Sequence, residues 1–176
     1  MARVVKLEIE NFRSIRSLAW LPQRGFNCLI GPGDSGKSTI LDAIAWCLTY
    51  NPRLEVTDAD FYRLEATQPI KIIVTLLDLP DRLGSLEPFG PFQGGFNPQT
   101  QEFEDEPGAG LETTLTVSLF IDESMQGQWS LESSRELDDH LRRVMAKRAL
   151  SELAILQMHG AGSQHLRFGQ GSVLFK

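Results

Sequence analysis

Eight residues near the N-terminus leave this chain few choices of fold, and they read Gly-Pro-Gly-Asp-Ser-Gly-Lys-Ser from Gly31 to Ser38. The pattern G-x-x-x-x-G-K-[ST] is typical of a loop whose backbone N–H groups surround a phosphate. An apolar run at residues 26–30 precedes the loop, and Ile40 and Ile44 follow it at helical spacing. A strand, this loop and an amphipathic helix in that order predict an α/β protein of the P-loop NTPase class. The alternative, a glycine-rich turn with an unrelated lysine, requires all the specified positions to match by chance.

Each residue type in the loop has a chemical reason. Glycine tolerates the conformations that turn successive N–H groups inward, which explains Gly31, Gly33 and Gly36. Lys37 supplies charge for the β- and γ-phosphates and is the first catalytic candidate, while the Ser38 hydroxyl is expected to bind Mg²⁺. The dipole of the following helix favours the same anion. The motif therefore predicts ATP and Mg²⁺ as ligands, with candidate contacts from Gly31, Pro32, Gly33, Asp34, Ser35, Gly36, Lys37, Ser38 and Thr39.

Composition limits the setting in which this loop works. The 176 residues fit one domain, and 41% hydrophobic with 23% charged residues is typical of a globular protein. No apolar run approaches the ~20 residues that span a bilayer, and the N-terminus lacks the apolar core of a signal peptide. We therefore expect a cytoplasmic location and no membrane partner. The net charge of -6 argues against a chain that grips nucleic acid over its whole surface. Cys28 and Cys47 lack metal-ligand spacing and are predicted to be buried free thiols.

Hydrophobic periodicity predicts the remaining elements. Strands are expected at residues 5–9, 15–21, 70–77, 115–122 and 128–132, and a helix at 134–158. Residues 80–110 hold five of the nine prolines and six of the fifteen glycines, together with several phenylalanines. We interpret this stretch as an insertion whose phenylalanines pack on the body of the domain.

The residues around the loop resemble a known family. Asn-Phe-Arg-Ser-Ile at 11–15, followed by the loop and its helix to residue 44, is similar to the ABC-type ATPase heads of the SMC and RecF group. Three further features resemble OLD-family ATP-dependent endonucleases. They are the Asp34-Ser35 pair before Gly36, the Asp58-Ala59-Asp60-Phe61 segment and the stretch from His165 to Ser172.

This resemblance implies a fold, partners and further site residues. The fold is expected to be lobe I of an ABC-type head with an N-terminal antiparallel β subdomain. Arg13 and Ser14 are candidate adenosine or phosphate contacts, the alternative being a solvated arginine and a turn-stabilising serine. The parent protein is expected to dimerise through its heads and to couple ATP hydrolysis to DNA processing, DNA repair or phage defence. Because a signature motif and a Toprim nuclease segment are not found, residues 1–176 are interpreted as a single lobe of a longer protein.

Asp122 and Glu123 offer a competing interpretation. They follow apolar residues, as the Asp-Glu pair of a Walker B motif does, and with them the chain would be a complete small ATPase. However, apolar residues at 115, 117, 119 and 121 alternate with Thr114, Thr116 and Ser118. This alternation favours an antiparallel hairpin with one exposed face. A third possibility is a structural or assembly module that binds ATP without hydrolysing it.

The predicted helix at residues 134–158 is rich in basic residues. They are Arg135, Arg142, Arg143, Lys147 and Arg148. A solvated face paired with nearby acidic residues is one interpretation, and a surface for DNA phosphates or a partner subunit is the other.

Overall fold

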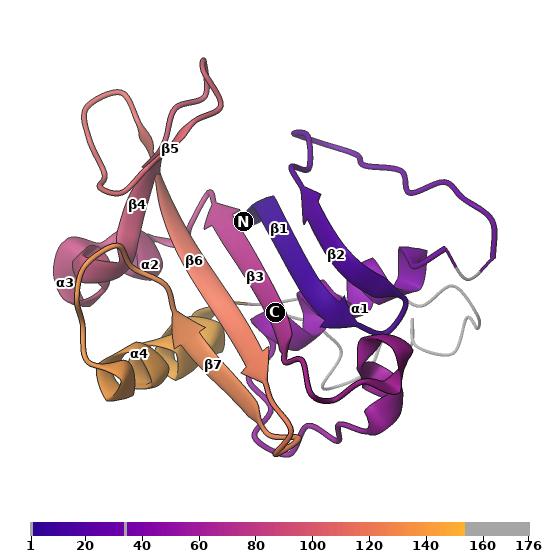
Figure 1. The fold of residues 1–176 in the computed structure, drawn as a ribbon. Helices are drawn as coiled ribbons and strands as arrows, with labels where there is room; N and C mark the ends of the chain where they lie inside the picture. The colour runs from indigo at the N-terminus through magenta and orange to yellow at the C-terminus, as the bar shows by residue number, and fades with distance from the viewer. Residues whose placement is uncertain (1, 34, 154–176) are drawn as a thin grey trace, which may run out of the picture.

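The computed structural model describes residues 2–33 and 35–153, which form one twisted antiparallel sheet with helices on one side (Figure 1). The seven strands run in the order β2-β1-β3-β6-β4-β5, and β7 pairs with β6. The strands are β1 (Arg3–Phe12), β2 (Ile15–Trp20), β3 (Ile70–Leu77), β4 (Gln93–Phe96), β5 (Phe103–Glu104), β6 (Glu112–Ile121) and β7 (Gly127–Leu131). The two longer helices are α1 (Lys37–Leu48) and α4 (Asp139–Glu152). The short helices are η1 (Asp58–Asp60), η2 (Tyr62–Leu64), α2 (Asp81–Gly84), α3 (Leu86–Phe89) and η3 (Gly90–Phe92).

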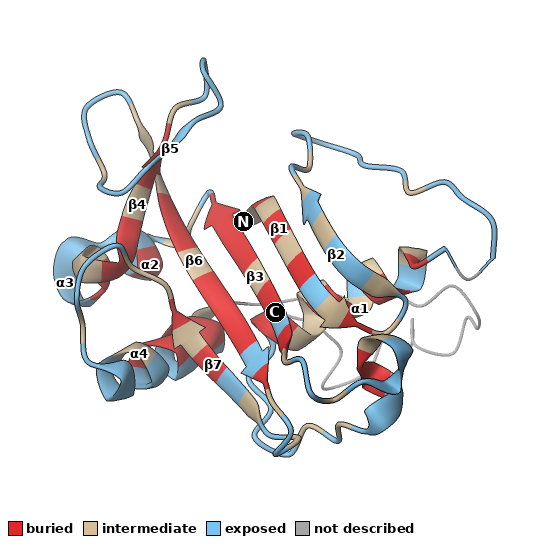
Figure 2. Cartoon of the chain, viewed as in Figure 1, coloured by how far each residue is buried: buried red, intermediate tan, exposed pale blue. Residues whose placement is uncertain are grey.

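The core lies between the sheet and the two longer helices. Alternate residues of the central strands are fully buried, as Ile72, Val117 and Leu119 illustrate, and Figure 2 shows the buried strands at the centre of the sheet. Helix α1 packs on β3 and β6, and α4 packs on β7. Ala43 of α1 and Ala149 of α4 belong to this same apolar cluster. The period of two in the strands therefore directs one face of the sheet toward the helices.

The periodic parts of the sequence fold as predicted. β1 and β2 form an antiparallel hairpin, and α1 begins at the residue after Gly36. The predicted hairpin at the end of β6 is also confirmed, because Val117 to Ile121 pair antiparallel with residues 127–131. The polar face of β6 is not exposed as expected, because Thr114 and Ser118 are buried. The basic helix starts later than expected, at Asp139, because Asp138 caps it by accepting the Leu141 backbone N–H. Residues 154–158, for which the sequence predicted helix, and the segment from His165 to Ser172 lie outside the described residues.

Residues 80–110 add structure to the edge of the sheet. β4 pairs with β6, so the sheet continues into the predicted insertion. Phe89, Phe92 and Phe96 are buried, as expected, whereas Phe103 is partly exposed and contacts Phe96 at 5.0 Å between ring centroids. The phenylalanines thus attach this glycine- and proline-rich segment to the domain.

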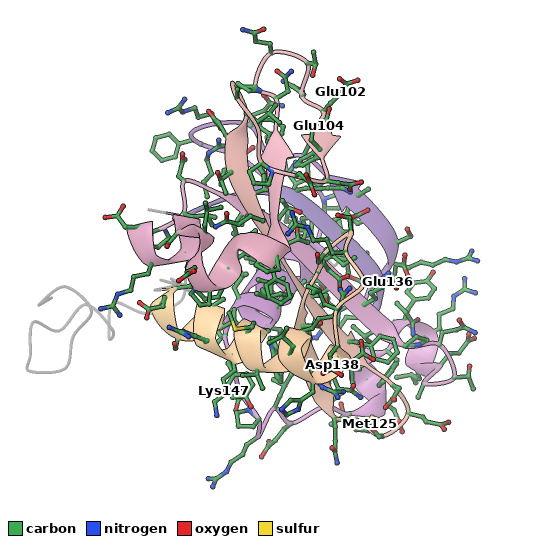
Figure 3. The ribbon with its side chains drawn as sticks, turned by 90° about the vertical axis from the view of Figure 1, so that its left-hand side faces the viewer. Glu102, Glu104, Met125, Glu136, Asp138 and Lys147 are labelled. Atoms are coloured by element: carbon green, nitrogen blue, oxygen red, sulfur yellow. The ribbon has the colours of Figure 1, made fainter. Side chains whose placement is uncertain are left out.

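Helix α4 presents a smaller basic surface than its sequence suggests. Arg142 donates to the carbonyl oxygens of Ser133, Arg135 and Leu137, and therefore stabilises the segment before the helix. Lys147 lies on the outer side of α4, as Figure 3 shows, with its ammonium 5.5 Å from the Tyr50 ring centroid. Among the described residues, the exposed cations of α4 are Arg143, Lys147 and Arg148.

Residues 26–30 contradict the prediction of a buried strand. They are not assigned to a strand, and the side chains of Phe26, Cys28 and Ile30 are exposed. An apolar strand is stable in a sheet only when neighbouring strands satisfy its backbone hydrogen bonds. In the part of the chain that the structure describes, none of the sheet strands pairs with this run. Its apolar residues therefore remain at the surface, immediately before the glycine-rich loop.

Candidate functional site

The glycine-rich loop ends at a tight junction with the first turn of α1. Gly36 precedes the helix with φ of 86°, in the left-handed region that glycine adopts without strain. A Cβ at Gly36 would lie 3.1 Å from the Ser14 Oγ and 3.4 Å from the Ile15 Cγ1. Both the conformation and the close approach of the β1–β2 turn therefore require glycine at this position.

The Lys37 ammonium contacts the backbone of the glycine-rich loop. Its Nζ donates to the Gly31 carbonyl oxygen at 2.9 Å, to that of Pro32 at 2.5 Å and to the Ser35 hydroxyl at 3.1 Å. Position 34 lies outside the described residues. A phosphate oxygen can replace any of these acceptors without loss of a hydrogen bond, and the new bond is between opposite charges. The Lys37 ammonium is thus held against the loop that precedes α1.

The two hydroxyl residues after Lys37 have different surroundings. Ser38 is exposed, and its hydroxyl makes no hydrogen bond to another described residue. Thr39 is buried, and its Oγ1 shares a hydrogen bond with the Ser14 Oγ at 3.2 Å. Ser38 is therefore available to a ligand, whereas Thr39 connects α1 to the β1–β2 turn.

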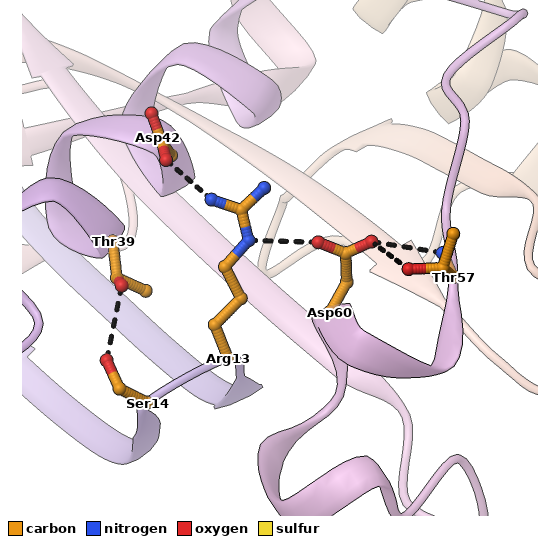
Figure 4. A network of polar contacts seen from close by, with 6 residues as sticks. All are labelled: Arg13, Ser14, Thr39, Asp42, Thr57 and Asp60. Atoms are coloured by element: carbon orange, nitrogen blue, oxygen red, sulfur yellow. Dashed lines mark hydrogen bonds and ion pairs between the residues drawn. The ribbon is translucent and has the colours of Figure 1, made fainter. Parts of the chain in front are cut away.

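Arg13 bridges three segments of the chain, as Figure 4 shows. Its Nε donates to the Asp60 Oδ1 at 2.9 Å, and its Nη1 donates to the Asp42 Oδ2 at 2.5 Å. The guanidinium carbon also lies 4.9 Å from the ring centroid of Phe12 and 5.1 Å from that of Trp46. Arg13 is therefore not a solvated turn residue, because Asp42 and Asp60 hold its guanidinium.

Asp42 and Asp60 are site residues that sequence reasoning missed. Asp60 accepts from the backbone N–H and the hydroxyl of Thr57, so the two residues form a capping box around η1. The signal for this cap was present in the sequence as Thr57 followed three residues later by Asp60. The contact with Arg13 had no local signal, because its partners are 29 and 47 residues away.

Asp122 and Glu123 lie in the turn between β6 and β7. β6 pairs antiparallel with β3, β4 and β7, so Asp122 and Glu123 follow a strand that continues into an antiparallel hairpin. The Asp122 carboxylate accepts the Ser124 backbone N–H at 2.9 Å, and hydrogen bonding by Ser124 lowers the pKa of Asp122. Within residues 2–33 and 35–153, no group of three or more acidic, cysteine or histidine side chains is placed to hold a metal ion. The same residues include no helix long and apolar enough to cross a membrane.

Comparison with solved structures decides the fold. An SMC ATPase, from work on ATP-driven dimerization and DNA-stimulated activation of these enzymes, superposes with a TM-score of 0.50 at 16% identity. The match covers 85% of this chain and 78% of that one. The fold is that of lobe I of an ABC-type P-loop ATPase head.

Sequence comparisons agree with this lobe I fold. Residues 6–78 match an AAA domain. The DNA replication and repair protein RecF of Chlorobium luteolum is 44% identical over 45 residues, which are 26% of this chain and 12% of RecF. The chromosome partition protein Smc of Methanocaldococcus jannaschii is 42% identical over 48 residues, which are 27% of this chain and 4% of Smc. These matches support the SMC and RecF group and do not single out the OLD family. They also cover only a small part of the length of each relative.

Proposed function

We propose that this lobe binds Mg·ATP on the loop from Gly31 to Ser38. The observation that carries the proposal is the Lys37 ammonium, held at the loop carbonyl oxygens beside the N-terminus of α1. A lysine charge, a left-handed glycine and a helix N-terminus together form an anion site of the type that binds nucleotide phosphates. The lobe I fold supports ATP as the nucleotide.

The proposed contacts divide by their chemistry. Lys37 neutralises the β- and γ-phosphates, and Ser38 binds the Mg²⁺ that bridges them. Backbone N–H groups of the loop surround the β-phosphate, with Pro32 as the exception because proline carries no N–H. Ser14 of the β1–β2 turn and Thr39 of α1 share a hydrogen bond beside the first turn of the helix.

We further propose that the lobe belongs to a longer ATPase that acts on DNA. The similarity to RecF and SMC proteins supports a role in DNA repair or chromosome maintenance, with a head-to-head homodimer as the hydrolysing state. An OLD-like nuclease in phage defence is a more specific form of this proposal and rests on the sequence resemblance alone. An ATP-dependent assembly module that does not hydrolyse ATP is the second candidate, favoured by the position of Asp122 and Glu123 in the turn of an antiparallel hairpin.

Replacing Ser38 with alanine is expected to weaken ATP binding about tenfold in Mg²⁺ and to change it little in EDTA. The hydroxyl acts through the metal, so its contribution disappears when the metal is removed. Isothermal titration of ATP with and without Mg²⁺ measures both affinities. Ser35→Ala is the matched control, because its hydroxyl contacts Lys37 and should have the same effect in both buffers. Equal impairment of Ser38→Ala in both buffers would show that Ser38 does not bind the metal.

A further inference from the structure

We propose that Arg13, Asp42 and Asp60 form a clamp that positions the first turns of α1, so that ATP affinity depends on a carboxylate remote from the phosphates. Arg13 and Asp60 are assigned as positioning residues, which act through α1. This inference rests on the proposed function, because it concerns the affinity of the same loop.

The clamp joins three segments that are distant in sequence. Arg13 belongs to the β1–β2 turn, Asp42 to α1 and Asp60 to η1, and Figure 4 shows the guanidinium between the two carboxylates. The side chains are 32%, 26% and 12% exposed, respectively. Partial burial protects both ion pairs from the screening that weakens surface pairs.

Asp60 anchors the clamp on the side away from the loop. One of its carboxylate oxygens accepts from Arg13 and the other accepts from Thr57. The Arg13 backbone N–H also donates to the Asp60 carbonyl oxygen at 2.8 Å, and Phe12 forms an isolated β-bridge with Phe61. Asp60 therefore fixes both the backbone and the guanidinium of Arg13.

The other end of the clamp reaches the helix that carries the phosphate ligands. Asp42 lies five residues after Lys37, so Arg13 contacts the second turn of α1. The neighbouring residue Ser14 contacts Thr39 and lies against Gly36. A preorganised site binds more tightly because it loses less conformational freedom on binding. Loosening Arg13 should therefore lower the affinity of the loop for ATP without removing any group that touches the nucleotide.

A direct role for Arg13 predicts the opposite sign. If the guanidinium were a nucleotide ligand, Asp60 would compete with ATP for it. Asp60→Asn would then release Arg13 and leave the affinity unchanged or higher. In the clamp, the same substitution removes the charged partner of Arg13 and the affinity falls.

The test compares the affinity of the chain for Mg·ATP, by isothermal titration, in four single variants and one double variant. We expect Asp60→Asn, Asp42→Asn and Arg13→Ala each to weaken binding about five- to tenfold. The double variant Arg13→Ala/Asp60→Asn should bind Mg·ATP no more weakly than Arg13→Ala, because both changes disrupt the same interaction. Asp58→Asn is the matched control. Asp58 is exposed on the same short helix, and its side chain has no hydrogen bond or ion pair to the described residues. The affinity of this variant for Mg·ATP should equal that of the wild type.

A spectroscopic measurement keeps the test independent of nucleotide binding. In the nucleotide-free protein, the amide resonances of Lys37, Ser38 and Thr39 should shift in Asp60→Asn and Asp42→Asn but not in Asp58→Asn. Unchanged resonances and an unchanged or tighter affinity in both variants would overturn the clamp. If that occurs while Lys37→Ala still abolishes binding, the clamp fails and the proposed function stands. Shifted resonances in a wild-type chain that does not bind Mg·ATP would instead overturn the proposed function.

Discussion

Replacing Lys37 with alanine is expected to weaken Mg·ATP binding about 100-fold. Hydrogen bonds to charged groups are worth about 1.5–3 kcal/mol, and each 1.4 kcal/mol changes a dissociation constant tenfold. The ammonium is also the only cation among the described loop residues, so no neighbour replaces its charge. Among the described residues, it donates to two carbonyl oxygens of the loop and to the Ser35 hydroxyl, and these groups can rebond to water when it is removed.

Titration of both proteins with a fluorescent ATP analogue in Mg²⁺ measures this effect. Lys71→Ala is a suitable control, because Lys71 is an exposed lysine on β3 and its removal changes the net charge equally. Circular dichroism establishes that each variant is folded. Equal affinities of the wild type and Lys37→Ala would show that the loop does not bind the nucleotide.

The isolated chain is expected to bind ATP yet hydrolyse it more slowly than about 0.001 s⁻¹, as P-loop proteins do without an activating partner. A phosphate loop supplies ground-state binding, and binding the substrate and the transition state equally does not accelerate the chemical step. Groups that stabilise charge on the transferred phosphoryl group are worth about 10³–10⁵-fold. Asp122 and Glu123 are the carboxylates proposed for such a role, but they lie in the turn of the antiparallel hairpin between β6 and β7.

Phosphate release at several protein concentrations tests this expectation, since a rate per molecule that rises with concentration indicates dimerization. The variants Asp122→Asn and Glu123→Gln are measured alongside the wild type. Steady turnover that disappears in either variant would contradict the expectation and favour the complete small ATPase.

Local patterns carried most of the correct predictions about the fold. Alternating residues in β1, β6 and β7 indicate which face meets the helices, and that information is contained in each segment. The failure at residues 26–30 has a different cause, because an apolar run becomes a strand only when another segment pairs with it. β4 was missed for a related reason. Its Gln93-Gly94-Gly95-Phe96 sequence has little strand propensity, and pairing with β6 decides its structure.

The candidate site could be predicted only in part. Lys37, Ser38 and the loop glycines lie in one contiguous motif, so their spacing alone identified them. Arg13 was also selected, but its partners could not be, because Asp42 and Asp60 meet it only after α1 and η1 have packed beside the β1–β2 turn. Long-range polar contacts of this kind leave no periodic signal in a single sequence.

Amide resonances of the wild-type chain during titration with Mg·ATP test the central claim most directly. If the loop binds the nucleotide, the largest shifts should occur at Gly31, Gly33 and the first turn of α1, because their N–H groups face the phosphates. The exposed turn at Asp122 and Glu123 should remain unshifted. Shifts that cluster away from residues 31–39, or a spectrum that saturating Mg·ATP leaves unchanged, would contradict the account.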